Sequence, residues 1–261
     1  MSNSTTFDDV TLSEDQKDTV VRVRVAMAFL SLFGSLFVLV SMVVFRKYRQ
    51  MSSRLVLMLS GMALVEAVAN IMSLGVYEEE RQHLASCMAQ GWLLQFSQNA
   101  IFSWTTVIGL NIFLVVCKSI ITSKYEIFYH LTVWSWVLFA SCLPFASNAY
   151  GEAGLWCWLT RTNGQVYRWV LFYVPLFLQI IAVFVFYILI IKHVLQTTEK
   201  TDNESENKAK SLLVRLRAYP IIFVCSYVFP IINRIYDATN LDDSFFLYLM
   251  QSITAPLLGF T

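Results

Sequence analysis

Residues 169–191 read WVLFYVPLFLQIIAVFVFYILII and contain no charged side chain. A helix needs about 20 predominantly apolar residues to cross the hydrocarbon core of a bilayer, so this run is long enough to span one. Further apolar runs lie at about 25–45, 55–76, 88–117, 128–147, 220–236 and 245–261. The sequence therefore predicts an all-α membrane protein, a bundle of seven transmembrane helices of which the last is short.

The composition agrees with this class. Apolar residues make up 57% of the 261 residues and charged residues 14%, whereas soluble domains carry about 25% charged residues. The net charge of +1 gives no reason to expect a nucleic-acid partner. We expect residues 1–24 to form an acidic extracellular leader, 25–261 the transmembrane domain, and 192–219 a flexible inner loop.

The basic residues predict the orientation. Twelve of the 19 lysines and arginines lie in the connectors after the first, third and fifth spans, and such residues are enriched in cytoplasmic loops. This predicts an outer N-terminus and a multi-pass protein of the plasma membrane, although Arg22 and Arg24, beside the first span, argue the other way. The sequon NST would allow glycosylation of Asn3 if the leader is outside.

This orientation separates the five cysteines. Only Cys87 and Cys157 are predicted to face an oxidising compartment, because the others lie in spans or at an inner end: Cys117, Cys142 and Cys225. We predict a Cys87–Cys157 disulfide, with a free Cys157 thiol as the alternative. Trp156 and Trp158 would flank the bridge, as an interfacial aromatic belt or as walls of an outer pocket.

Several segments together carry a family resemblance. They are FSWTTVIGLNIF (102–113), YGEAGLWCWL (150–159), RLRAYPIIFVCSYVFPIINRIYD (215–237) and APLLGF (255–260). The chain resembles the cyclic-AMP-receptor-like family of seven-helix G-protein-coupled receptors, which includes plant receptor-like members. It is less similar to rhodopsin-like receptors, because LVVCKSI at 114–120 contains no D-R-Y-like triplet. The resemblance implies a heterotrimeric G protein as partner and a small extracellular ligand, with cyclic AMP the first to test.

Polar and aromatic residues near the predicted outer mouth are the ligand candidates. Gln95 and Asn99 begin a polar stripe on the third span, which must face protein or water. An anionic ligand would need a guanidinium for its phosphate and an aromatic face for its base. The remaining candidates are therefore Trp156, Trp158, Arg168 and Arg234. For each of them a purely structural contact is the alternative, such as an ion pair of Arg234 with a nearby aspartate.

Basic residues on the inner side are the coupling candidates, because the resemblance implies that the inner ends of the helices contact the G protein. They are Arg46, Lys47, Lys192, Arg215 and Arg217. The alternative is that these charges only fix the topology. Pro230, in the sixth span, is a candidate hinge, because proline removes a backbone donor and kinks helices.

Glu66 is the carboxylate deep in a predicted span. An isolated carboxylate there is costly and is expected to face the bundle interior. It is interpreted either as a neutral acid that links two helices or as a residue with a signalling or ion-linked role. Family members commonly carry an acid one turn earlier, at the position of Ala63.

The sequence favours no enzyme, metal or cofactor. The three histidines lie in connectors or at span ends, and a G-x-S-x-G motif is missing. Two alternatives to the receptor stay open. One is a seven-helix carrier, although the chain shows no internal repeat. The other is a truncated, non-signalling relative that pairs with intact receptors, suggested because the chain stops at Thr261.

Overall fold

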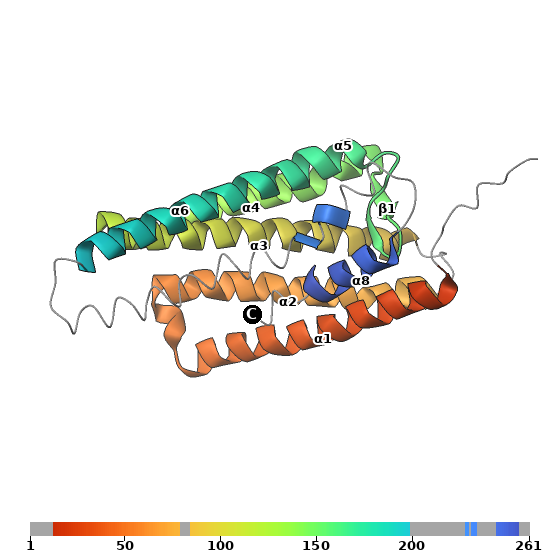
Figure 1. Cartoon of the computed structure of the whole chain (residues 1–261), viewed down its shortest axis with the longest axis horizontal. Coiled ribbons are helices and arrows are strands. Elements are labelled where there is room, and N and C mark those ends of the chain that lie inside the picture. The colour runs from red at the N-terminus through yellow and green to blue at the C-terminus, as the bar shows by residue number, and fades with distance from the viewer. Residues whose placement is uncertain (1–12, 79–83, 199–227, 230, 234–243, 256–261) are drawn as a thin grey trace, which may run out of the picture.

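The computed structural model describes residues 13–78, 84–198, 228–229, 231–233 and 244–255. These residues form a bundle of long helices that lie side by side, with a small β-hairpin at one end (Figure 1). The long helices are α1 (Glu14–Val44), α2 (Met51–Glu78), α3 (Leu84–Lys118), α4 (Glu126–Cys142) and α6 (Val174–Thr198). A shorter helix, α8 (Phe245–Thr254), packs against α1. The helical membrane architecture agrees with the prediction, while the sixth span, 220–236, lies largely outside the described residues.

Helix α1 begins at Glu14 rather than at residue 25. Ser13 caps it: the Ser13 hydroxyl accepts a hydrogen bond from the Gln16 backbone N–H at 3.3 Å, and the Gln16 side chain accepts one from the Ser13 N–H at 3.1 Å. This reciprocal pair is a capping box. The negative charges of Glu14 and Asp15 in the first turn also stabilise the helix by interacting with the positive end of its dipole. Part of the predicted leader is therefore helical, and Arg24 lies within the bundle.

The boundaries of the other helices lie closer to those predicted from the sequence. The fourth span continues from α4 into a 3-10 turn, η3 (Leu143–Ser147), and helix α6 continues to Thr198, into the segment predicted as a loop from residue 192. Two further 3-10 turns, η1 (Lys47–Arg49) and η2 (Thr122–Tyr125), connect helices at the end of the bundle opposite the hairpin.

The fifth span is interrupted near its start. It consists of α5 (Gln165–Arg168), a π-helical turn, η4 (Trp169–Tyr173), and α6. Pro175 lies four residues after Leu171, and a proline has no N–H and crowds the carbonyl four residues before it. The wide turn therefore accommodates Pro175, and the Leu171 carbonyl accepts a hydrogen bond from the Gln95 side chain instead, at 3.5 Å.

The connector after α4 forms a hairpin, which the sequence patterns did not predict. Strand β1 (Tyr150–Glu152) pairs antiparallel with β2 (Cys157–Leu159), with Gly151 opposite Trp158. The Tyr150 hydroxyl donates to the Ser141 carbonyl at 2.7 Å, and burial raises the pKa of this phenol above its usual value, so the donor keeps its proton. The connector is thus an ordered, buried part of the fold rather than an exposed loop.

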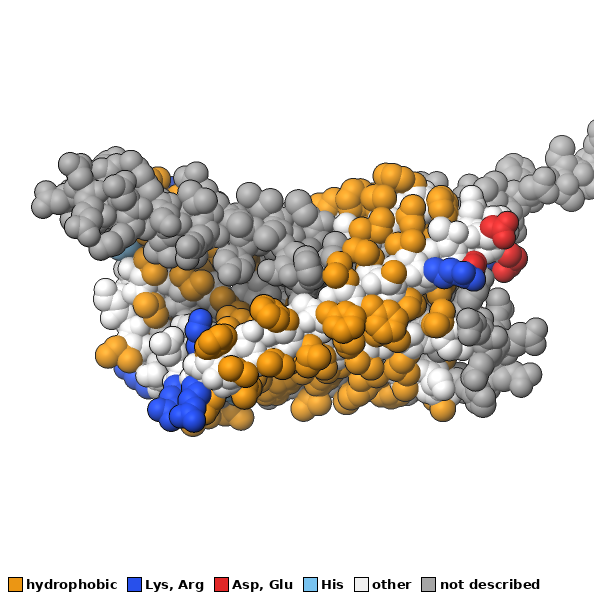
Figure 2. Space-filling view, turned by 90° about the horizontal axis from the view of Figure 1, so that it is seen from below, with side chains coloured by type: hydrophobic (Ala, Val, Ile, Leu, Met, Phe, Trp, Pro, Cys, Tyr) orange, Lys and Arg blue, Asp and Glu red, His pale blue; other side chains and the backbone are white. Residues whose placement is uncertain are grey.

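The exterior of the bundle is apolar along its middle. In Figure 2 hydrophobic side chains cover the middle of the visible face, lysine and arginine gather near one end, and acidic side chains lie at the other end beside further basic ones. On α1, Phe29, Phe33 and Phe37 are 44%, 65% and 74% exposed. Five of the described helices are long and apolar enough to cross a membrane. This surface fits lipid, and the chain is a multi-pass membrane protein.

Candidate functional site

The hairpin is covalently tied to the bundle. Cys87, in the first turn of α3, and Cys157, the first residue of β2, form a disulfide with a Cα–Cα distance of 5.2 Å. Both residues are buried. The pairing expected from the sequence is therefore present, and it fixes β2 over the start of α3.

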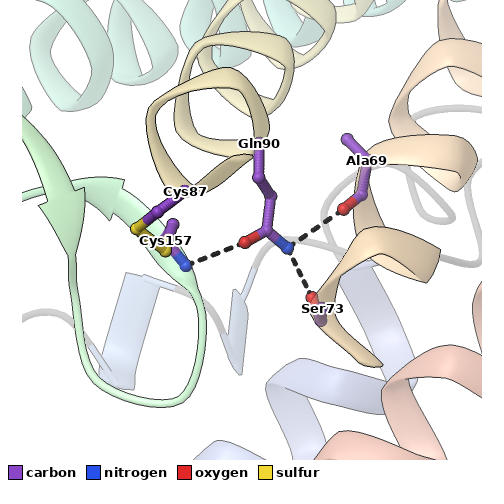
Figure 3. The surroundings of a disulfide bond; sticks show 5 residues. All are labelled: Ala69, Ser73, Cys87, Gln90 and Cys157. Carbon is purple, nitrogen blue, oxygen red and sulfur yellow. Dashed lines mark hydrogen bonds between the residues drawn. A yellow bond between two sulfur atoms is a disulfide. The ribbon is translucent and has the colours of Figure 1, made fainter. Parts of the chain in front are cut away.

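Gln90 holds the same strand by hydrogen bonds (Figure 3). Its side-chain oxygen accepts from the Cys157 backbone N–H at 3.1 Å. Its amide nitrogen donates to the Ala69 carbonyl at 3.1 Å and the Ser73 hydroxyl at 2.7 Å, both on α2. One fully buried amide thus joins the hairpin, α3 and α2.

Gly91 lets the hairpin approach α3 closely. A Cβ atom on Gly91 would lie 3.1 Å from the Tyr150 ring and 3.2 Å from the Trp158 Cα. Since one of these neighbours is backbone, it cannot turn away as a flexible side chain does. Glycine therefore suits this position because of the close approach, not because of its backbone angles.

We predict that Gly91→Ala lowers the free energy of unfolding by about 1–3 kcal/mol, the usual cost of overpacking a close contact. Gly61→Ala is the matched control, because a Cβ there meets nothing within 4 Å and alanine is the better helix former. Thermal unfolding of the detergent-solubilised protein measures both variants. Equal midpoints for Gly91→Ala and the parent protein would contradict the close packing.

Gln95 connects the hairpin to the π turn. Its side-chain oxygen accepts from the Trp158 indole N–H at 2.9 Å, while its nitrogen donates to the Leu171 carbonyl. Asn99, one turn further along α3, donates to the Gln95 carbonyl at 2.9 Å. The structure thus buries both of these predicted ligand residues, with Gln95 joining three segments of the chain.

Arg168 also contacts the hairpin. Its Nε donates to the Leu159 carbonyl at 2.8 Å, and a second guanidinium nitrogen donates to the same oxygen. The guanidinium carbon lies 5.4 Å from the centre of the Trp158 ring. These contacts make Arg168 a support for β2, whether or not it also meets a ligand.

Trp156, at the tip of the hairpin, contacts the first helix. The guanidinium carbon of Arg24 lies 3.9 Å from the centre of the Trp156 ring, and Arg24 Nε donates to the Asn70 side-chain oxygen at 2.8 Å. The ring of Trp156 also meets that of Tyr248 on α8 edge-on, at 5.8 Å between centres. Since Trp156 and Trp158 are each only 4% exposed, neither belongs to an interfacial belt.

A pocket lies beneath these residues, here called the outer pocket. It is lined by polar side chains from α1, α3 and α8 and by apolar rings from the hairpin and the fifth span. Its lining residues include Arg24, Gln98, Gln251, Trp156, Trp158 and Phe172. Its cavity volume is about 40 Å³, enough for a few water molecules. The tryptophans are thus walls of a pocket, as one of the two interpretations held.

Glu66 lies deeper in the bundle. It is 3% exposed, and one of its oxygens accepts from the Gln98 amide at 2.9 Å. Glu66 therefore links α2 to α3, as expected of a buried acid.

At the opposite end, the coupling candidates that the structure describes are exposed. Arg46 and Lys47 lie at the turn between α1 and α2, and Lys192 lies on α6. Nearby, the Arg54 guanidinium pairs with both oxygens of Glu126 at 2.5 Å, which joins the starts of α2 and α4. Five predicted residues lie outside the described part of the chain: Asn3, Arg215, Arg217, Pro230 and Arg234.

Sequence reasoning missed three residues that shape this site. Arg24 was counted as an outer charge, although its place inside the apolar run VVRVRVAMAFL (20–30) was a signal. Gln90 lies one turn after Cys87, on the same helix face. Gly91 gave no signal, since its role depends on which backbone packs against it. Among the residues that the structure describes, no group of three or more histidine, cysteine or acidic residues is placed to hold a metal ion.

A bundle of apolar helices closed at one end by a disulfide-tied hairpin is typical of a seven-helix membrane receptor. The chain belongs to the slime mold cyclic AMP receptor family, whose model matches residues 11–254. The resemblance expected from the sequence is confirmed.

Individual relatives agree with the family. The chain is 25% identical to cyclic AMP receptor-like protein A of Dictyostelium discoideum, over 97% of this chain and 65% of that protein. It is 27% identical to G-protein coupled receptor 1 of Arabidopsis thaliana, over 95% of this chain and 77% of that protein. It is 26% identical to cyclic AMP receptor 4 of Dictyostelium discoideum, over 79% of this chain and 47% of that protein. The chain thus spans between about half and three quarters of the length of these relatives.

Proposed function

We propose that this protein is a receptor that transmits an extracellular ligand signal to a heterotrimeric G protein, and that cyclic AMP is the first ligand to test. The observation that carries the proposal is the outer pocket, closed by a disulfide-tied hairpin at the end of the bundle opposite the exposed Arg46 and Lys47. The family and the names of the relatives support a receptor and a cyclic nucleotide. Ligand recognition and partner coupling then occur at opposite membrane faces.

The direct test is a G-protein activation assay in cells. The full chain is expressed in cells that also carry a G-protein dissociation sensor, and cyclic AMP is titrated on the outside. We expect cyclic AMP to cause saturable dissociation of the G-protein subunits, reported by the sensor, and no such response in cells without the chain. A flat response to the ligand together with no basal dissociation, at verified surface expression, would overturn the proposal.

We predict that Arg46→Ala/Lys47→Ala lowers nucleotide exchange several-fold, because exposed basic residues steer and orient a partner surface. Arg22→Ala is the matched control, since Arg22 is an exposed arginine near the opposite end of α1. An epitope tag at the N-terminus, read on unpermeabilised cells, separates lost coupling from inverted topology. Undiminished exchange in the double variant at normal surface level would remove these residues from the coupling surface.

A further inference from the structure

We propose that the two turns at the end of the bundle opposite the hairpin, η1 and η2, form a binding site for the headgroup of a multiply phosphorylated membrane lipid. Arg49 of η1 and Lys124 of η2 are the residues that bind its phosphates. The proposal involves neither the outer pocket nor a G protein, so it goes beyond the proposed function and does not depend on it.

One side chain holds the two turns together. The Arg54 guanidinium donates to two carbonyl oxygens of η1, that of Arg49 at 3.1 Å and that of Tyr48 at 3.4 Å. The same guanidinium binds both carboxylate oxygens of Glu126, the first residue of α4, at 2.5 Å. Since Lys124 lies only two residues before Glu126, these bonds keep the backbones of Arg49 and Lys124 close to each other.

The charges at this end are not balanced within the described part of the chain. Lysine and arginine side chains gather here (Figure 2), whereas Glu126 is the acid that the described residues supply, and Arg54 engages both of its oxygens. Arg49 and Lys124 are exposed, and no described acid forms an ion pair with either. An anionic partner would therefore supply the acceptor oxygens that the described residues do not.

The side chains around the two turns place this site at the membrane surface. Tyr48 and Tyr125, each adjacent in sequence to one of the two cations, are exposed, and tyrosine is enriched where the hydrocarbon core meets the headgroups. Phe45 and Ile121, which lie shortly before the two turns, are 70% and 76% exposed. Apolar side chains thus meet acyl chains beside cations that meet headgroups, which favours a lipid over a soluble phosphate compound.

The predicted orientation makes this end cytoplasmic, and the cytoplasmic leaflet carries the anionic lipids. A guanidinium and an ammonium each bind a phosphate through charge-assisted hydrogen bonds. Because Arg49 and Lys124 lie on separate turns, a headgroup with several phosphates can contact both cations at once. The site is therefore expected to prefer a phosphoinositide to a lipid with a single phosphate.

The test uses the purified full chain in detergent micelles, without a G protein. Phosphatidylcholine, phosphatidylserine or phosphatidylinositol bisphosphate is titrated in, and native mass spectrometry gives the dissociation constant of each lipid. We expect the bisphosphate to bind most tightly and to lose affinity about tenfold or more in Arg49→Gln/Lys124→Gln. The matched control is Lys17→Gln/Arg22→Gln, which removes the same charge near the other end of the bundle and should bind as the parent chain does.

Glu126→Gln separates a shaped site from general attraction to a basic surface. It makes the chain more positive but weakens the contact by which Arg54 joins the two turns. A shaped site should therefore lose affinity for the bisphosphate in this variant, whereas general attraction would increase the affinity.

Four results would overturn the proposal. They are unchanged affinity in Arg49→Gln/Lys124→Gln, an equal loss in the matched control, higher affinity in Glu126→Gln, and full competition by an equal concentration of soluble inositol trisphosphate. The last result would indicate a site for a soluble phosphate compound rather than a lipid. Because Arg46 and Lys47 stay unchanged in every variant, the G-protein response measured in parallel tests the proposed function separately.

Discussion

Replacing Cys157 with serine is expected to lower the stability of the folded protein by about 2–5 kcal/mol, the usual effect of removing a native disulfide. The Cys87–Cys157 bond closes 70 residues of sequence separation and holds β2, whose Trp158 packs under Gln95 and Arg168. Without the bond these buried side chains lose the constraint that keeps them over α3. Surface expression measured by flow cytometry, and thermal unfolding in detergent, should both fall.

Cys117→Ser is the control for this change, because Cys117 is a free cysteine near the other end of α3. The double variant Cys87→Ser/Cys157→Ser should be no less stable than Cys157→Ser alone, since both lose the same bond. If Cys157→Ser kept the full surface level and the unfolding temperature of the parent chain, the hairpin would not depend on its disulfide.

The second large effect is expected for Gln90→Leu. The leucine leaves the Cys157 N–H without its acceptor, and an unsatisfied buried group costs about 1–3 kcal/mol. The Ala69 carbonyl and Ser73 hydroxyl lose a shared donor as well, so the variant should approach the upper end of this range. Chemical or thermal unfolding in detergent measures the difference from the parent chain.

Ala89→Leu provides the comparison, because Ala89 is the next residue along the chain, is exposed and takes the same new side chain. Combining Gln90→Leu with Cys157→Ser should cost less than the sum of the two, since both anchor the same strand and residues in contact are not additive. Full additivity would show that the hydrogen bond and the disulfide hold the hairpin independently.

Sequence patterns were sufficient for the five long helices that the structure describes and for the disulfide, because both follow from one-dimensional signals. Long uncharged runs identify spans, and the predicted topology leaves Cys87 and Cys157 as the pair on the outer side. The hairpin was not predictable in the same way, since strands of three residues such as Tyr150–Glu152 are too short to show an alternating pattern.

The site was predicted by residue type but not by arrangement. Gln95 and the two tryptophans were identified from the sequence as polar or aromatic residues near the mouth. The hydrogen bonds that join Trp158, Gln95 and Leu171 were not predicted, because they depend on the Leu171 carbonyl having no helical N–H partner at Pro175. Arg24 was assigned to the predicted extracellular leader, because counting charges gives no information on which helix packs over a side chain. Pairwise contacts between distant segments are the information that the linear pattern lacks.

The contact between the first and last described helices has a consequence for biosynthesis. Helix α8 packs against α1, and its Tyr248 meets Trp156 of the hairpin and lies against Gly154 in the hairpin turn. The ribosome synthesises α8 after α1 and the hairpin, which α8 contacts. Until α8 is inserted, the surface around Arg24 that α8 later covers stays polar and incompletely covered. The contacts of Trp156 and Gly154 with α8 form only after α8 has been inserted, which makes that surface a feature by which a membrane chaperone would distinguish a nascent chain from one in which α8 is in place.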